Sequence, residues 1–95
     1  MEIERRISPD DVVELNPNYH FRWEEPQQAH VLLYPEGIVK LNQTAAAILE
    51  ACTGSSSIAA GTEELSRRYR RRDLSAEVLK FLEVAHAKGW IRVKS

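Results

Sequence analysis

The chain is poor in cysteine, glycine, proline and net charge, and these shortages exclude several classes of protein. The single cysteine, Cys52, cannot form a disulfide within the chain. Only four glycines and four prolines occur among 95 residues, and no repeat or low-complexity segment is present. The formal net charge of −1 gives no overall basic character of the kind that nucleic-acid-binding domains carry.

Long apolar runs are also missing. No stretch approaches the roughly 18 residues of a membrane-spanning helix, and the chain does not start like a signal peptide. These features predict a soluble cytoplasmic protein. A chain of this length forms one domain that buries roughly 60 to 65% of its unfolded surface, so the core is modest and a deep active-site cavity is hard to fit.

Side chains with catalytic or metal-binding chemistry are few and scattered. No recognisable metal-ligand spacing joins the three histidines, His20, His30 and His86. Cys52 falls on a core-facing position and has no histidine partner in the pattern. Because no nucleophile, base and oxyanion group converge, we expect neither an enzyme nor a metal or cofactor site.

Three short strands are predicted in the first half of the chain. The alternation of apolar and polar residues predicts a strand at 20–24, and apolar runs predict two more at 29–34 and 37–41. The turn between the last two contains Pro35, which suits the second position of a type I turn. Gly37 is expected to adopt a left-handed conformation and to close the hairpin with a bulge. Both faces of the strand at 29–34 are apolar.

Three helices follow, and each is expected to begin at a polar capping residue. The caps are Asn42, Ser57, and either Asp73 or Ser75. Gly54 and Gly89 are placed to end the first and third helices. An interior glycine costs a helix about 1 kcal/mol relative to alanine, so Gly61 predicts that the second helix is the loosest.

These elements predict an α+β domain in which a three-stranded antiparallel meander precedes three helices in a winged helix-turn-helix-like arrangement. We expect residues 1–16 to form an N-terminal arm that could be flexible or exchanged between chains, and residues 17–95 to form a single domain. The large side chains of residues 90–93 are expected to close one end of the core.

Five arginines lie in the run Arg67–Arg72, and with a helix-turn-helix they favour a DNA-binding regulator as the alternative function. The third helix, however, begins with residues that offer few donors to base edges. Cations also suit the negative end of a helix. We therefore expect the run to end the second helix and to present a basic patch to an acidic protein.

The third strand offers a more specific hypothesis. In a meander the first and third strands are edges, and only Lys40 places a charge on the third. The third helix carries an unusually wide apolar arc, flanked by Leu79 and Val84. The edge and the helix could together bind an extended peptide that adds a strand. A homodimer that pairs the same edges, or the N-terminal arm crossing the edge, would account for the same pattern.

The segments FRWEEPQQAHVLLYPEGIVKLN, AAAIL, LxxRY, LxxEVxxFL and GWI resemble the PqqD family, the pyrroloquinoline quinone (PQQ) biosynthesis protein D family, from about residue 16 to residue 91. The segment QQAHVLLYPEG is highly specific. The resemblance implies a RiPP precursor recognition element: a non-catalytic, cytoplasmic chaperone that binds the precursor peptide PqqA. It also implies that the peptide is presented to the radical SAM enzyme PqqE, which cross-links a glutamate and a tyrosine.

In this family the peptide is expected to dock along the third strand and the third helix. The expected strand residues are Ile38, Val39, Lys40 and Leu41, and the expected helix residues are Val78, Leu79, Leu82 and His86. One departure concerns Gly61, which stands where the family leads us to expect a bulky aliphatic residue. The second helix should therefore be less well packed.

Overall fold

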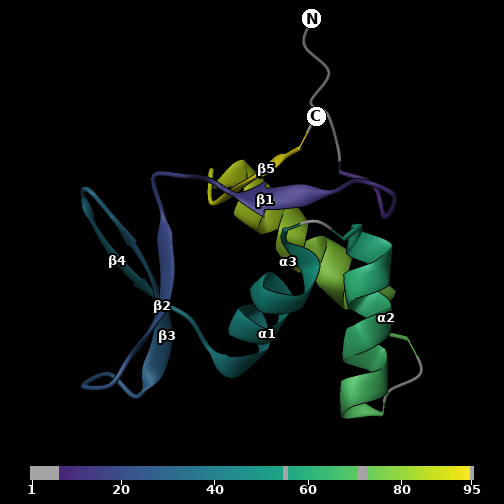
Figure 1. Ribbon diagram of the computed structural model, residues 1–95, viewed down its shortest axis with the longest axis horizontal. Helices are drawn as coiled ribbons and strands as arrows, with labels where there is room; N and C mark the ends of the chain where they lie inside the picture. Colours follow the sequence, from purple (N-terminus) through teal and green to yellow (C-terminus); the bar gives the residue numbers. More distant parts are fainter. Residues whose placement is uncertain (1–6, 55, 71–72, 95) are drawn as a thin grey trace, which may run out of the picture.

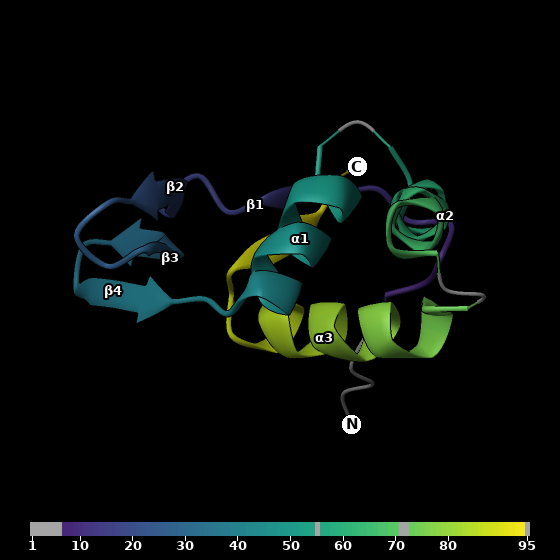
Figure 2. The same ribbon diagram turned by 90° about the horizontal axis from the view of Figure 1, so that it is seen from below.

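The computed structural model describes residues 7–54, 56–70 and 73–94 (Figure 1). A three-stranded sheet stands at one side of three packed helices, and a small second sheet lies across the helices (Figures 1 and 2). The elements are β1 (Val13–Leu15), β2 (His20–Glu24), β3 (Ala29–Tyr34), β4 (Gly37–Lys40), α1 (Gln43–Cys52), α2 (Ile58–Tyr69), α3 (Ser75–Ala87) and β5 (Ile91–Val93).

The larger sheet confirms the predicted meander. It has the order β2-β3-β4, and both pairings are antiparallel. One detail of the hairpin is wrong in the sequence-based expectation. Gly37 pairs directly with Tyr34 and does not lie in the left-handed region, so Pro35 and Glu36 form a two-residue turn without a bulge. The short turn already satisfies the strand register, and no extra residue is needed.

The smaller sheet was not predicted. Its strands β1 and β5 pair antiparallel, with Val13 opposite Val93 and Leu15 opposite Ile91. An ion pair joins the same strands on the surface, where Arg92 Nε lies 2.7 Å from Glu14 Oε2. Glu14 and Arg92 are 78 positions apart in the sequence, so the pairing of β1 with β5 joins two distant segments of the chain.

The described part of the N-terminal arm therefore packs against the rest of the chain. Ile7 and Val13 are buried in the core. The backbone N–H groups of Ile58 and Ala59 donate to the carbonyl oxygens of Asp11 and Pro9. The arm therefore provides hydrogen-bond acceptors for two N–H groups in the first turn of α2, which have no partner within the helix. Residues 1–6 lie outside the described residues, and exchange of the arm between two chains stays a prediction.

Polar side chains cap the first two helices as the sequence predicts. Asn42 Oδ1 accepts from the backbone N–H of Ala45 at 2.7 Å, and Ser57 Oγ accepts from the N–H of Ala60 at 3.1 Å. At α3 the expected cap, Asp73 or Ser75, is wrong: the N-cap residue is Leu74, which makes no side-chain cap hydrogen bond. Asp73 lies one residue earlier, and its carboxylate accepts from the N–H of Ser75, the first residue of the helix. This bond lowers the pKa of Asp73, because it stabilises the charged form.

The expectation of a loosely packed second helix is wrong. Gly61 is buried where α2 meets α1, and a Cβ atom built on it would overlap the carbonyl oxygen of Ala51 and lie 2.8 Å from the Cα of Cys52. The glycine therefore lets two helix backbones approach closely. The cost in helix propensity is offset by contacts that a larger residue would prevent.

The last turn of α2 carries the described part of the arginine run. Arg67 and Arg68 lie in this turn, where cations suit the negative helix end, while Arg71 and Arg72 lie outside the described residues. Arg68 Nη2 lies 3.3 Å from Glu64 Oε2, an exposed pair one turn away. Arg70 ends the helix in the left-handed region, at φ 53° and ψ 43°.

The left-handed Arg70 gives a testable prediction about stability. A side chain is strained in this region and glycine is not, so we expect Arg70→Gly to raise the free energy of unfolding by about 0.5–1 kcal/mol. Urea denaturation followed by circular dichroism measures the change. The matched control is Arg67→Gly, which places glycine inside the same helix turn and should lower stability by a similar amount. A loss of stability in Arg70→Gly would contradict the strain.

Candidate functional site

The free edge of β4 is the first component of the site. The backbone N–H of Leu41 donates to the carbonyl of His30, so these two residues form a hydrogen-bonded pair of the β3–β4 ladder. Such pairs alternate along an antiparallel ladder, and Val39 therefore points its backbone groups toward Leu32. The N–H and C=O groups of Ile38 and Lys40 point away from β3, toward the open side of the sheet.

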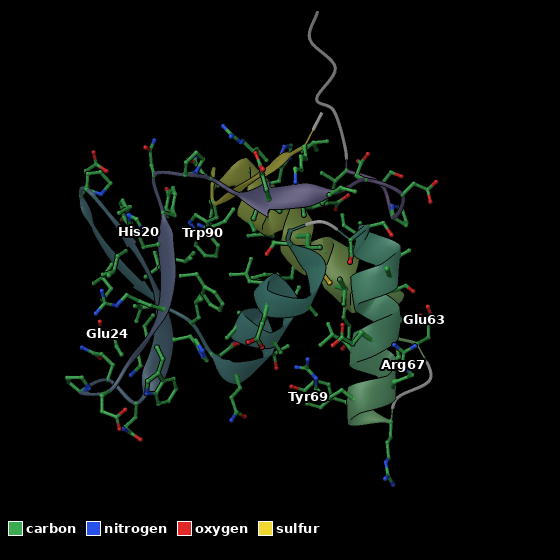
Figure 3. The ribbon with its side chains drawn as sticks, viewed as in Figure 1. His20, Glu24, Glu63, Arg67, Tyr69 and Trp90 are labelled. Atoms are coloured by element: carbon green, nitrogen blue, oxygen red, sulfur yellow. The ribbon has the colours of Figure 1, made fainter. Side chains whose placement is uncertain are left out.

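The opposite edge of the sheet, on β2, is better protected. Arg22 and Glu24 form an ion pair there, with Arg22 Nη2 3.1 Å from Glu24 Oε2. His20 and Glu24 lie on the side of the sheet that faces away from the helices (Figure 3). Charged side chains on an edge strand discourage pairing with another chain. On β4 the only charged side chain is that of Lys40.

The four predicted strand residues divide between two faces. Leu41 is buried and Val39 packs against the core, so both face the helices. Ile38 is 50% exposed, and Lys40 is also exposed, both on the outer face. A peptide strand added to this edge would place its own side chains alternately beside the outer pair and the inner pair.

The strand β3 is apolar on both faces, and the sequence does not show what shields its outer face from water. Part of that face is shielded by side chains of the neighbouring strands. Val31 is fully buried and lies between Arg22 on β2 and Lys40 on β4 in the cross-strand register. The aliphatic stems of such side chains cover apolar surface while their charged ends stay in water. Val31 is therefore buried within the sheet, whereas Leu33 and its cross-strand neighbour Ile38 on the same face stay partly exposed.

The four predicted helix residues do not form one accessible surface. Val78 and Leu82 are buried at 1% and 0% exposure, where they hold α3 to the core. Leu79 lines a small cavity of about 260 Å³ between α2 and α3, beside Pro9 of the N-terminal segment. His86 is half-buried. The structure thus brings the strand residues together but turns Leu79 away from the end of β4.

A larger cavity of about 510 Å³ opens next to the end of β4, between the three helices. Its polar rim includes Asn42, Gln43 and Thr44, the residues that directly follow the strand. The floor is made of buried apolar side chains, which come from all three helices: Ala45, Ile48, Leu65 and Val78.

Two aromatic side chains form the walls of this cavity. Tyr69 is 52% exposed and projects from α2 toward the α1 side, whereas Glu63 and Arg67 lie on the other side of α2 (Figure 3). Phe81 comes from α3, and the centroid of its ring lies 6.4 Å from the centroid of the Trp90 ring. Trp90 lies between the sheet and the helices (Figure 3). Neither Tyr69 nor Phe81 is among the site residues that the sequence predicts.

Cys52 lies in the core, away from the open edge of β4. It is fully buried between α1 and α2, and burial raises the pKa of its thiol from 9.0 to about 11. Among the described residues no group of three or more histidine, cysteine, aspartate or glutamate side chains could hold a metal ion. No helix in the described ranges is long and apolar enough to cross a bilayer.

The raised pKa predicts slow reaction of Cys52 with thiol reagents. At pH 8 a thiol with a pKa of about 11 is only about 0.1% thiolate, roughly 100-fold less than one with a pKa of 9.0. We expect native protein to react with a maleimide at least about 100-fold more slowly than protein unfolded in guanidinium chloride. Equal rates for the native and unfolded protein would show that the thiol is accessible and ionised.

Comparison with known proteins gives consistent matches over most of the chain. The family model described as coenzyme PQQ synthesis protein D (PqqD) matches residues 29–91. The chain is 44% identical over 86 residues to the PqqA binding protein of Methylococcus capsulatus, covering 90% of this chain and 92% of the relative. It is 47% identical over 85 residues to the PqqA binding protein of Azotobacter vinelandii, covering 88% and 92%.

A solved structure also resembles the fold. It is the solution NMR structure of the PqqD truncation of Methylobacterium extorquens PqqCD, described as a functional and stand-alone RiPP recognition element. The two chains superpose with a TM-score of 0.75 at 26% identity, and the match covers 90% of this chain and 93% of the other. The strands and helices that form the site lie within the part of the chain that these matches cover.

Proposed function

The chain belongs to the PqqD family of coenzyme PQQ synthesis proteins, and from this membership we propose that it binds the precursor peptide PqqA as a RiPP recognition element. Relatives of similar length carry the name PqqA binding protein. The observation that carries the proposal is the open edge of β4, where two residues direct their backbone groups outward.

Strand addition is the binding mode that this edge supports. Ile38 and Lys40 together offer two donors and two acceptors to an extended peptide. Main-chain hydrogen bonds of this kind give affinity for any extended sequence, and selectivity comes from side-chain contacts. The half-exposed Ile38 gives an apolar contact on the outer face, and Lys40 can pair with an acidic side chain of the peptide.

The chain acts in this proposal as a cytoplasmic adaptor without catalytic activity of its own. It presents the bound peptide to the radical SAM enzyme PqqE, which carries out the chemistry. The groups of the site are backbone amides, backbone carbonyls and apolar side chains, and these suit holding a peptide rather than reacting with it. A second copy of the chain could pair with the same β4 edge, so a homodimer would compete with the peptide.

Titration of ¹⁵N-labelled protein with synthetic PqqA tests the proposal. The amide signals of residues 38–41 should shift, with signals around Tyr69 and Phe81 following, and binding should persist at moderate salt. Shifts confined to Arg67, Arg68 and Arg70 would contradict the assignment of the edge. Duplex DNA serves as the control ligand, because a DNA-binding regulator would bind it with an affinity that falls steeply with salt.

A further inference from the structure

The cavity of about 510 Å³ between the helices begins close to the end of β4. The strand ends at Lys40, and the rim of the cavity begins at Asn42. Two residues of extended chain span about 7 Å. A peptide strand that pairs with Ile38 and Lys40 therefore needs only a few further residues to extend from the end of β4 as far as the rim of the cavity.

The lining of the cavity selects the chemistry of its occupant. Ile48, Leu65 and Val78 are buried and form an apolar floor, on which an apolar side chain of the peptide would be removed from water. The polar side chains of the lining include Asn42, Gln43, Thr44 and the carboxylate of Glu77, and all four of these residues are exposed to water. A volume of this size lies in the range of about 300–1,000 Å³ that ligand pockets occupy. One large apolar side chain can enter it while the peptide backbone stays at the polar rim.

Two rings favour an aromatic occupant. Tyr69 and Phe81 stand on opposite helices of the cavity, and the half-exposed Tyr69 ring has apolar surface that the chain itself leaves uncovered. Aromatic side chains gain additional stabilisation from offset-stacked or edge-to-face contacts with such rings. An aliphatic side chain would bury the same floor but would not make these contacts.

We propose that this cavity binds one large apolar side chain of the precursor peptide, preferably an aromatic one, from the stretch that continues past Lys40. Because side chains alternate along a strand, the occupant is a residue that faces the helices, on the same side as Val39 and Leu41. The β4 edge then holds the peptide irrespective of sequence, and the cavity fixes its register. This inference rests on the proposed function, because it assumes that the peptide adds a strand to β4.

Filling the cavity from its own wall tests the inference. Ala47 is a half-buried residue of α1 that lines the cavity, so Ala47→Phe places a ring inside it and leaves β4 unchanged. Calorimetric titration of the full chain with synthetic PqqA should show affinity weakened roughly 10- to 100-fold. The matched control is Ala60→Phe, which adds the same ring at an exposed position of α2 that does not line the cavity, and affinity should change less than about twofold.

A second pair of measurements keeps the test independent of folding defects in Ala47→Phe. Tyr69→Ala removes a half-exposed wall residue and should weaken binding several-fold. Replacing each apolar residue of PqqA by alanine should identify one whose loss weakens binding to the unchanged protein, but has little further effect on Ala47→Phe. Such coupling identifies the occupant of the cavity.

The outcomes separate this inference from the proposed function. If PqqA binds the unchanged protein, and neither Ala47→Phe nor Tyr69→Ala alters the affinity, the cavity is not a subsite and the inference is overturned. The proposed function then stands on the β4 edge alone. If PqqA does not bind the unchanged protein at all, the proposed function itself fails, and the cavity inference falls with it.

Discussion

Gly61→Ala should destabilise the protein by about 1–3 kcal/mol, although alanine is the better helix former. The added methyl group would overlap the carbonyl oxygen of Ala51 and lie 2.8 Å from both the Cα and the Sγ atom of Cys52. Two of these neighbours are backbone atoms of α1, so relief requires the helices to separate. Separation opens gaps along the whole α1–α2 contact, and interiors are too closely packed to absorb them cheaply.

The measurement is the free energy of unfolding in urea, with the slope of the transition checked for two-state behaviour. Ala60→Gly is the matched control, because it makes the reverse change one position earlier on the exposed side of α2 and should cost about 1 kcal/mol. Propensity alone would make the two variants move in opposite directions. A more stable Gly61→Ala would show that the helices yield easily and that the close approach is unimportant.

A larger residue at the same position should have a larger effect. Gly61→Leu introduces a side chain that no relaxation of the Cys52 thiol can accommodate, because the Ala51 carbonyl and the Cys52 backbone remain in its way. We expect a loss that approaches the total stability of a small domain, about 5–15 kcal/mol. The bulky aliphatic residue that family resemblance leads one to expect at this position is therefore incompatible with this chain.

This contrast shows which features of the fold could be read from the sequence. The strands at 20–24 and 29–34 and the caps Asn42 and Ser57 were predicted correctly, because alternation and capping are properties of short segments. Whether glycine at position 61 stabilises or destabilises the fold depends on how closely α1 and α2 approach each other. That distance is a tertiary property, and helix propensity contains no information about it.

The second sheet was missed for a related reason. β1 and β5 have three residues each, which is too short for an alternating pattern to stand out. Their stability comes from pairing with each other and from the carbonyls that the arm gives to α2 and to Gly54. Only a structure that brings the two ends of the chain together reveals such contacts.

The free edge of the larger sheet was predicted from the sequence, and the cavity between the helices was not. The open edge at 37–40 follows from the order of strands, and the structure places it as the sequence indicates. On α3, periodicity shows which residues are apolar but treats the two flanks of the apolar stripe as equivalent. Leu79 is on one flank and Phe81 is on the side of the stripe nearer to Val84, the other flank. Of these two residues only Phe81 lines the cavity of about 510 Å³.

Ile38→Pro should weaken the binding of PqqA roughly 10- to 100-fold while leaving the fold intact. The register makes Ile38 one of the two residues whose N–H points to the open side, so proline removes a donor that the proposed peptide strand needs. Its ring also occupies the space of the added strand. Proline is tolerated on an edge strand where the N–H faces solvent, so stability should change little.

Two control variants separate the backbone from the side chain. Ile38→Ala keeps the N–H and removes most of the exposed side chain, and it should cost only a few-fold in affinity. Val39→Pro makes the same backbone change one residue later, where the N–H points to Leu32 inside the hairpin, and it should lower stability by about 1–3 kcal/mol. The sequence could not distinguish these two positions, because the alternation of outward and inward amides has two possible phases until one ladder bond is known. If Ile38→Pro is folded and binds PqqA as tightly as the unchanged protein, the peptide does not add a strand to β4.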